Sequence, residues 1–334
     1  MLVTELRDQP AYVLSPAVLV AGASLVFSQD LDDAYIATPF DPKVDYLQEE
    51  IIRTLRRVPA GDEIGFEFSQ SPDIVGHLAR DVIPLNLLHP ANYFHFLIEG
   101  LPSLLFLIQN DLVSANALLV TGLLHPNMAL ALTYVTQRAP LPILQLRTMQ
   151  AASCDRVLLA PPSWHATERL DGSVSDSTYD APKIQLAREA FKPLWADPAT
   201  TSPLKLFIRR VSGQRMLSNA AEAERMAISA GYQVIDPGGL SIGDQIRLFS
   251  SASHIIGPTG AWAANLLFAR DDAKVTVLYP QTCATETNTW KALGEACGIE
   301  VEEVYCPVTL LRERQPIHSD FMVPSEQLAA RLRA

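Results

Sequence analysis

The chain has 334 residues, a length typical of two domains or of one large one. Hydrophobic residues make up 48% of it and charged residues 19%, so it can bury a sizeable core, and global disorder is excluded. The net charge of −11 argues against a nucleic-acid partner and against a broad electrostatic grip on anionic lipid, because both need a basic surface. Acidic residues outnumber basic ones mainly before residue 168, so we expect any small anionic ligand in the second half.

Short apolar runs alternate with longer amphipathic ones in the first half of the chain. Helices are expected over residues 44–58, 92–109, 126–139 and 182–195. The first of these has one apolar face, made of Tyr46, Leu47, Ile51, Ile52 and Leu55. Strands are expected over 11–22, 82–88, 117–122, 141–146 and 156–160. Such alternation favours an α/β fold with a parallel sheet buried on both faces.

A loop is expected over residues 171–179, and the Pro/Ser/Thr-rich segment 197–205 is the candidate domain boundary. The alternation then restarts. Strands are expected over 205–210, 232–236, 254–257, 274–280 and 301–306. Helices are expected over 219–231, 241–253, 261–269, 290–298 and 325–334. The second half therefore predicts an open, doubly wound sheet.

The cysteines do not have the spacing of a metal or redox site. No pair among Cys154, Cys283, Cys297 and Cys306 forms a CxxC motif, so we expect buried thiols in a reducing compartment, and no metal site. The polar start of the chain lacks the features of a signal peptide, and no apolar run reaches about 18 residues. We expect a cytoplasmic protein, with peripheral contact at the inner face of the cytoplasmic membrane left open.

The strongest local motif covers residues 254–268, where an apolar strand runs through Gly-Pro-Thr-Gly directly into a helix. Gly257 and Gly260 allow a tight turn and a close backbone approach. The N–H groups at the helix start, near Ala261, would bind a phosphate, and Thr259 could cap the helix or donate to a ligand oxygen. The alternative is a tight turn between strand and helix that binds no ligand.

A cluster of arginines follows the first predicted strand of the second half. Arg209 and Arg210 end the strand and Arg215 follows a Ser-Gly turn, where doubly wound sheets bind their ligands. Guanidinium groups suit bidentate phosphate recognition. Asn219 is expected to cap the next helix with Glu222 as its partner. The alternative is a solvated charged turn.

A third candidate site lies at the start of the predicted helix over 92–109. His95 and Glu99 are four residues apart and share one helical face, with Asn92 a further turn back. A histidine beside a carboxylate suits general-base catalysis, and the apolar surroundings of Glu99 could raise its pKa. The alternative is a core histidine with a structural hydrogen bond.

Two weaker motifs have simple structural explanations. Gly239 to Gly243 matches the GxSxG pattern of serine hydrolases, with Asp271 and His318 in hydrolase order. However, Ser241 followed by Asp244 is also typical of a helix N-cap. The pair Asp30 and Asp32 resembles a metal-binding DxD motif but lies in an acidic segment typical of a turn.

Three blocks of the sequence together resemble the family 61 glycosyltransferases, a group that includes capsular-polysaccharide-type enzymes. The blocks are residues 92–106, 206–219 and 231–280, and the resemblance extends over roughly 80–300. It implies a GT-B fold, in which two Rossmann-like domains face a cleft, and metal-independent transfer that inverts the anomeric carbon. The implied domains are an acceptor-side α/β domain over 1–196 and a nucleotide-sugar-binding domain over 197–315. The tail over 316–334 would pack back on the first domain.

The resemblance also implies residue roles and partners. Glu99 with His95 would deprotonate the acceptor, with Asn92 and Tyr93 on the acceptor side. No cofactor is implied; the co-substrate is a nucleotide sugar, expected to be a UDP-sugar, and the acceptor a glycan or glycolipid. The residues implied to contact the donor are Arg209, Arg210, Arg215, Asn219, Gly257, Thr259, Gly260, Ala261 and Asn265. This chain departs from the family pattern at Thr259, where a histidine is usual, and at Val277, where a glutamate is usual. Serine hydrolysis by Ser241 and non-catalytic nucleotide or sugar binding stay as alternatives.

Overall fold

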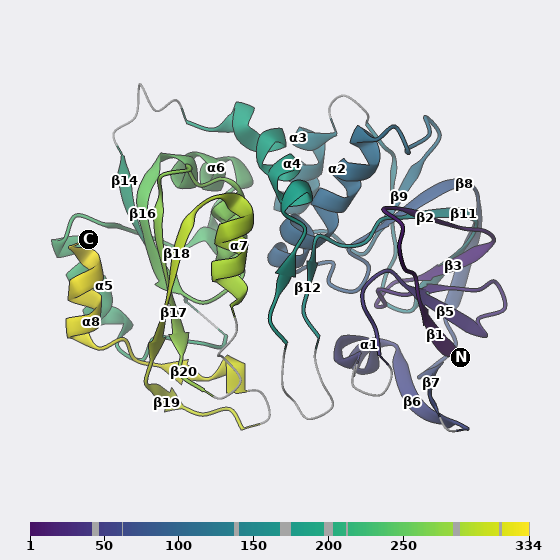
Figure 1. Ribbon diagram of the computed structural model, residues 1–334, viewed down its shortest axis with the longest axis horizontal. Coiled ribbons are helices and arrows are strands. Elements are labelled where there is room, and N and C mark those ends of the chain that lie inside the picture. The colour runs from purple at the N-terminus through teal and green to yellow at the C-terminus, as the bar shows by residue number, and fades with distance from the viewer. Residues whose placement is uncertain are drawn as a thin grey trace. The chain divides into compact units, whose positions relative to one another are not determined.

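The computed structural model describes residues 1–41, 47–61, 63–136, 140–167, 175–196, 203–211, 213–282, 288–313 and 316–333. The chain divides into two compact units, Met1–Ser175 and Asp176–Ala334 (Figure 1), called unit 1 and unit 2 below. The predicted boundary at residue 196 differs from this division, which falls before helix α4 (Ala181–Phe191). The helix therefore belongs to unit 2, where it packs against α7 (Thr289–Cys297).

Unit 1 contains a nine-stranded mixed sheet. Its main path runs β1-β5-β4-β3-β11-β8-β9-β10, with β2 paired to β11. The strands are β1 (Leu2–Glu5), β2 (Tyr12–Leu14), β3 (Ala17–Val20), β4 (Val26–Phe27), β5 (Asp33–Ile36), β8 (Asp73–Leu85), β9 (Leu118–Thr121), β10 (Ile143–Gln145) and β11 (Gln150–Leu159). Only the part from β11 to β10 is a parallel run of four strands. The prediction of a parallel sheet is correct for this run, whereas β3, β4 and β5 pair antiparallel across short connections.

The helices of unit 1 are α1 (Gln48–Arg53), the π-helix η1 (His95–Gly100), α2 (Leu101–Gln109) and α3 (Pro126–Val135). The predicted helix over 44–58 is only partly correct, and residues 44–46, including Tyr46, lie outside the described residues. The chain leaves the helix after Arg53 and enters a hairpin, β6 (Leu55–Ala60) with β7 (Glu63–Phe68). Gly61, with a φ of 67°, supplies the left-handed conformation at the hairpin turn. Leu55 is the first residue of β6, and its side chain is buried there rather than on a helix.

Unit 2 contains a five-stranded parallel sheet, as predicted for the second half. The strand order is β15-β14-β16-β17-β18, with bounds Gln233–Ile235, Leu204–Ile208, Ala252–Pro258, Lys274–Pro280 and Glu300–Cys306. The connecting helices are α5 (Ala220–Ser229), α6 (Ile242–Ser251), the 3₁₀ helix η4 (Ala261–Leu267) and α7. This is a doubly wound order, and its direction reverses between β14 and β16.

The remaining elements of unit 2 are short, and the last ones pack within the unit. They are β13 (Thr178–Tyr179), η2 (Lys192–Leu194), η3 (Pro237–Gly239), β19 (Val308–Leu310), η5 (Pro316–His318), β20 (Asp320–Phe321) and α8 (Ser325–Leu332), while β12 (Trp164–His165) belongs to unit 1. The tail is predicted to pack back on the first domain, and the contacts described for it lie within unit 2. Figure 1 shows α8 beside α5, and Leu328 and Leu332 share a buried cluster with Ala223 and Ala227.

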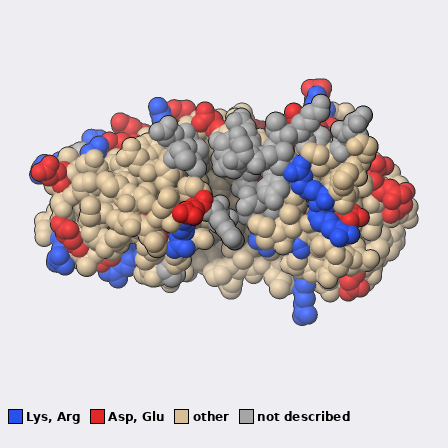
Figure 2. Space-filling model, turned by 90° about the horizontal axis from the view of Figure 1, so that it is seen from below, with Lys and Arg blue, Asp and Glu red and all other residues tan. Residues whose placement is uncertain are grey.

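Charged side chains of both signs are interspersed on the face of the molecule drawn in Figure 2. The net charge of −11 is therefore not gathered into one acidic patch on this face. Among the described residues, no helix is both long enough and apolar enough to cross a lipid bilayer.

Candidate functional site

In unit 1, His95 and Glu99 form a hydrogen-bonded pair at the start of the long apolar helix. The Nδ1 atom of His95 lies 2.7 Å from Oε2 of Glu99. Both residues belong to η1, and their side chains are 15% and 27% exposed. The pairing predicted from their spacing is confirmed. Because the imidazole is held by the carboxylate and both groups reach solvent, the pair can accept a proton from a bound hydroxyl group.

Aromatic side chains that the sequence analysis did not single out surround this pair. The ring of His89 stacks on His95 with centroids 3.9 Å apart, and Trp164 meets the edge of His95 at 5.3 Å. Burial lowers the pKa of His89 to about 3, with electrostatic interactions with His95 and Arg53 adding to the effect. His89 is therefore neutral at physiological pH. The indole Nε1 of Trp164 is buried without a hydrogen-bond partner among the described residues.

The two residues expected on the acceptor side are located beside the pair. Asn92 is exposed, and its Oδ1 accepts a hydrogen bond from the backbone N–H of Phe94 at 3.0 Å. It therefore starts the helical segment that carries His95 and Glu99. Burial raises the pKa of the Tyr93 phenol, so this hydroxyl stays protonated at physiological pH.

In unit 2, the arginine loop and the glycine turn meet at the point where the sheet reverses direction. Arg210 follows β14, and Thr259 and Gly260 follow β16, its neighbour in the sheet. The Nη1 atom of Arg210 donates to the carbonyl oxygen of Thr259 at 3.4 Å. A Cβ atom on Gly260 would lie 2.5 Å from the same Nη1, so the absence of a side chain makes room for the guanidinium. Doubly wound sheets bind ligands at this position.

Arg215 and two residues from the end of the chain join Arg210. The Nε atoms of Arg210, Arg215 and Arg312 and the Nδ1 atom of His318 are buried without a hydrogen-bond partner among the described residues. Burial lowers the pKa of Arg215 to about 10, and the positive charge of Arg210 adds to this effect. Buried donors are normally paired, so this cluster has the properties of an anion site. The sequence analysis missed Arg312 entirely and considered His318 only for hydrolysis.

Two residues expected to contact the donor are engaged elsewhere. Arg209 forms a two-point ion pair with Glu224 of α5, its Nε lying 2.8 Å from Oε1. Asn219 makes no cap of α5; its side chain donates to the carbonyl of Val323 at 2.9 Å and accepts from the same residue's N–H. These contacts hold α5 and the end of the chain in place, and a donor contact of either residue stays a prediction.

Several residues of the glycine turn also have structural roles. Thr259 is completely buried and its hydroxyl accepts a hydrogen bond from the indole of Trp290 at 2.8 Å. Asn265 is completely buried and donates to Gln245 at 2.9 Å. A Cβ atom on Gly257 would lie 2.5 Å from the Cβ of Ile208, so this glycine allows two strands to pack closely. These three residues thus have internal packing roles, and their donor contacts stay predictions.

Val277 and Ala261 also belong to the segment in which the resemblance places the donor site. Val277, the second departure from the family pattern, is completely buried within β17. Ala261, at the first position of η4, is half-buried next to Gly260. Of the residues expected to contact the donor, Arg210, Arg215, Gly260 and Ala261 are thus the strongest candidates for ligand contact.

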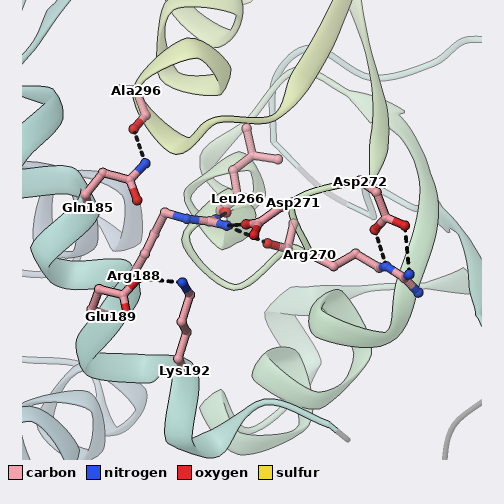
Figure 3. Close-up of polar contacts among 10 residues, drawn as sticks. Gln185, Arg188, Glu189, Lys192, Leu266, Arg270, Asp271, Asp272 and Ala296 are labelled. Carbon is pink, nitrogen blue, oxygen red and sulfur yellow. Dashed lines mark hydrogen bonds and ion pairs between the residues drawn. The ribbon is translucent and has the colours of Figure 1, made fainter. Parts of the chain in front are cut away.

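The hydrolase triad does not form among the described residues. Ser241 is the N-cap of α6, accepting from the N–H of Asp244 at 3.1 Å and donating to its Oδ2 at 2.6 Å. Asp271 instead receives a 2.7 Å hydrogen bond from Arg188 (Figure 3). His318 lies with the arginine cluster. The GxSxG pattern is therefore a helix cap preceded by a 3₁₀ turn, not a strand followed directly by a nucleophile.

Neither the DxD motif nor the cysteines form a metal site in the described part of the chain. Asp30 accepts hydrogen bonds from Ser28 and from the N–H of Asp32, which makes this segment a turn between β4 and β5. No group of three or more His, Cys, Asp or Glu side chains that could hold a metal ion is found among the described residues. The three described cysteines are buried and reduced, and burial raises the thiol pKa of each to about 12: Cys154, Cys297 and Cys306. Cys283 lies outside the described residues.

The fold is a mixed α/β fold, and the second candidate site lies at the switch point of its five-stranded parallel sheet. The family model described as Glycosyltransferase 61 matches residues 93–276, more than half of the chain. The protein therefore belongs to the glycosyltransferase 61 family. The matched segment includes His95, Glu99, Arg210, Arg215 and Gly260. No curated protein matches the chain.

Proposed function

We propose that the protein transfers a sugar, with inversion, from a nucleoside diphosphate sugar to a glycan or glycolipid acceptor. UDP is the first nucleotide to test, and the setting we propose is bacterial polysaccharide biosynthesis at the inner face of the cytoplasmic membrane. The two units would correspond to the two domains of a GT-B enzyme. The observation that carries the proposal is the guanidinium of Arg210 against the turn at Thr259 and Gly260, at the switch point of a doubly wound sheet.

The proposed donor site supports departure of a diphosphate. When the bond between the anomeric carbon and the phosphate oxygen breaks, the leaving group takes the electron pair and gains negative charge. Arg210 and Arg215, with the N–H groups at the start of η4, supply fixed positive charge and donors for that oxygen. Because guanidinium groups can do what a divalent cation does in other transferases, we propose that the reaction needs no metal.

The proposed acceptor step uses the pair in unit 1. The acceptor hydroxyl attacks the anomeric carbon from the face opposite the diphosphate and loses its proton to Glu99. His95, hydrogen-bonded to Glu99 at 2.7 Å, orients the carboxylate and shares the proton after transfer. Displacement from the opposite face inverts the configuration at that carbon. Each unit thus supplies one half of the chemistry.

The proposal is tested by assaying transfer from a panel of nucleotide sugars, with and without EDTA, for the wild type and Glu99→Gln. We expect Glu99→Gln to lower the rate by about 10²–10⁴-fold, because the amide cannot accept the proton, while UDP binding is retained. Glu67→Gln is the matched control, since Glu67 is an exposed carboxylate of unit 1 paired with Arg56. Transfer by Glu99→Gln at the wild-type rate would exclude Glu99 as the base.

Two other outcomes decide the finer points. Loss of activity in EDTA that Mg²⁺ or Mn²⁺ restores would contradict the metal-independent mechanism. Nucleotide binding without turnover across the whole panel of donors and acceptors would favour a non-catalytic binding homologue. The departures at Thr259 and Val277 motivate that alternative, but both side chains are buried away from solvent.

A further inference from the structure

The segment after the last strand of the parallel sheet lies against the arginine loop of unit 2. The N–H of Arg215 donates to the carbonyl of His318 at 3.2 Å, and Met216 donates to Oδ1 of Asp320 at 2.9 Å. Phe321 returns a hydrogen bond to the carbonyl of Met216 at 3.0 Å, and its ring is completely buried. Residues far apart in the sequence are therefore held together by backbone contacts and by a buried aromatic anchor.

This segment brings two more nitrogen atoms without hydrogen-bond partners to the arginine cluster. The Nε of Arg312 and the Nδ1 of His318 are buried without a hydrogen-bond partner among the described residues, like the Nε atoms of Arg210 and Arg215. An unpaired buried donor is unfavourable unless a ligand or water satisfies it. Three guanidinium donors, together with an imidazole nitrogen that donates in one of its two neutral tautomers, fit an acceptor with several oxygen atoms.

The net positive charge of the cluster also indicates an anionic ligand. Three guanidinium groups, of Arg210, Arg215 and Arg312, carry positive charge, and the carboxylate that lies with them is Asp320, 3.5 Å from Nη2 of Arg312. His318 is neutral, because burial and the three arginines lower its pKa to about 4. The cluster thus holds an excess of positive charge that a group with two or more negative charges would balance.

We propose that Arg312 and His318 contact the phosphate oxygens of the ligand at the switch point, so that the C-terminal segment completes the site. Arg312 supplies a charged donor and His318 a neutral one. Both residues lie outside the segment that matches the glycosyltransferase 61 family, which ends at residue 276. The inference rests on the proposed function, because that function identifies the ligand as the diphosphate of a sugar donor.

The test measures calorimetric affinity for inorganic pyrophosphate and for UDP in Arg312→Gln and His318→Leu. We expect each change to weaken both ligands by about tenfold or more, as for loss of a hydrogen bond to a charged group. The matched control is Arg331→Gln, which removes the same charge from α8, where Arg331 pairs with Glu302 at 2.7 Å. The control should bind as the wild type does.

Conservative variants separate ligand contact from folding. Arg312→Lys keeps the charge and His318→Asn keeps an amide donor, so each should retain more affinity than its partner variant. If Arg312→Gln or His318→Leu does not fold, as judged by circular dichroism, these variants decide the question. Wild-type affinity in the variants that fold would overturn the inference.

The failure of this inference differs from the failure of the proposed function. If Arg215→Gln loses pyrophosphate binding while Arg312→Gln and His318→Leu keep it, the donor site stands and the C-terminal contribution is wrong. If the wild type binds neither pyrophosphate nor UDP, both proposals fall together.

Discussion

The arginines at the two ends of η4 differ in how far their hydrogen-bond donors are paired. At its carboxyl end, Arg188 is 1% exposed and donates to the carbonyls of Leu266 and Ala269, at 2.6 and 3.0 Å, and to Asp271 (Figure 3). At its amino end, Arg210 and the nearby Arg215 keep buried Nε atoms without partners among the described residues. A buried guanidinium with satisfied donors stabilises the fold, whereas one with free donors is available to a ligand.

The first prediction concerns the satisfied arginine and has the largest expected effect on stability. Arg188→Leu removes the side-chain donor to the carbonyls of Leu266, in the last turn of η4, and Ala269, just after it. It also leaves Asp271 without its ion-pair partner and should lower the free energy of unfolding by about 3–5 kcal/mol. The matched control is Arg270→Gln, since Arg270 pairs with Asp272 near the surface (Figure 3). That change should lower it by less than about 1 kcal/mol. Chemical denaturation of the purified variants measures both, and equal losses would contradict the comparison.

The second prediction concerns Arg215, near the amino end of η4, whose Nε atom has no hydrogen-bond partner among the described residues. Arg215→Gln should leave the melting temperature of the ligand-free protein unchanged or higher, because it removes a desolvated cation that lies near Arg210. The same change should abolish the rise in melting temperature with pyrophosphate, which for the wild type corresponds to about 2.7 kcal/mol at 100 times the dissociation constant. Arg209→Gln is the control, because Arg209 is paired with Glu224 and should respond to pyrophosphate as the wild type does. Loss of the response in Arg209→Gln would contradict this assignment.

These two arginines also show how far the sequence could predict the site. Successive side chains of an extended chain point to opposite sides, so Arg209 and Arg210, which directly follow β14, are not expected to reach the switch point together. The local sequence does not say which of the two does. The five strands of the parallel sheet in unit 2 and the helices between them, by contrast, are predicted from the sequence, since each has a clear apolar pattern. The short elements β13, β19 and β20 are not.

Other parts of the molecule depend on contacts that no local pattern encodes. His318 reaches the arginine cluster because β20 pairs beside Leu217, about a hundred residues earlier in the chain. In unit 1, the hairpin that replaces the end of a predicted helix depends on tertiary packing of Leu55 and Phe66. His95 and Glu99 were predicted as a pair because helical spacing alone brings them together.

The third prediction extends the comparison to unit 1, which buries a carboxyl group instead of a guanidinium. Glu50 is 3% exposed, its Oε1 accepts hydrogen bonds from the N–H and hydroxyl of Ser24, and burial raises its pKa above the ordinary value. Its contribution to stability is therefore present below the ordinary pKa and is lost as the pH rises through the folded-state pKa. Glu50→Gln keeps the accepting oxygen and does not ionise.

The melting temperature of Glu50→Gln should therefore exceed that of the wild type by about 2–4 °C at pH 8, with no difference near pH 4. Glu67→Gln, at an exposed position, should show no such pH dependence. A difference that stays the same at both pH values would mean that the Glu50 carboxyl does not ionise in this range.

The last prediction concerns a helix end that a neighbouring side chain satisfies. Ser241→Ala removes the cap of α6 and should lower the free energy of unfolding by about 1 kcal/mol, while Ser241→Asn, which keeps an accepting oxygen, should lower it less. Sugar transfer should be unchanged in both variants. Loss of activity in a stable Ser241→Ala variant would mean that the Ser241 hydroxyl takes part in the reaction. The effect is small because a single local hydrogen bond is lost, the one that the N–H of Asp244 donates to the Ser241 hydroxyl. In η4, the carboxyl end is bound by Arg188 of α4, and we propose that the amino end binds a diphosphate. One end of this helix therefore has a structural role and the other a functional one.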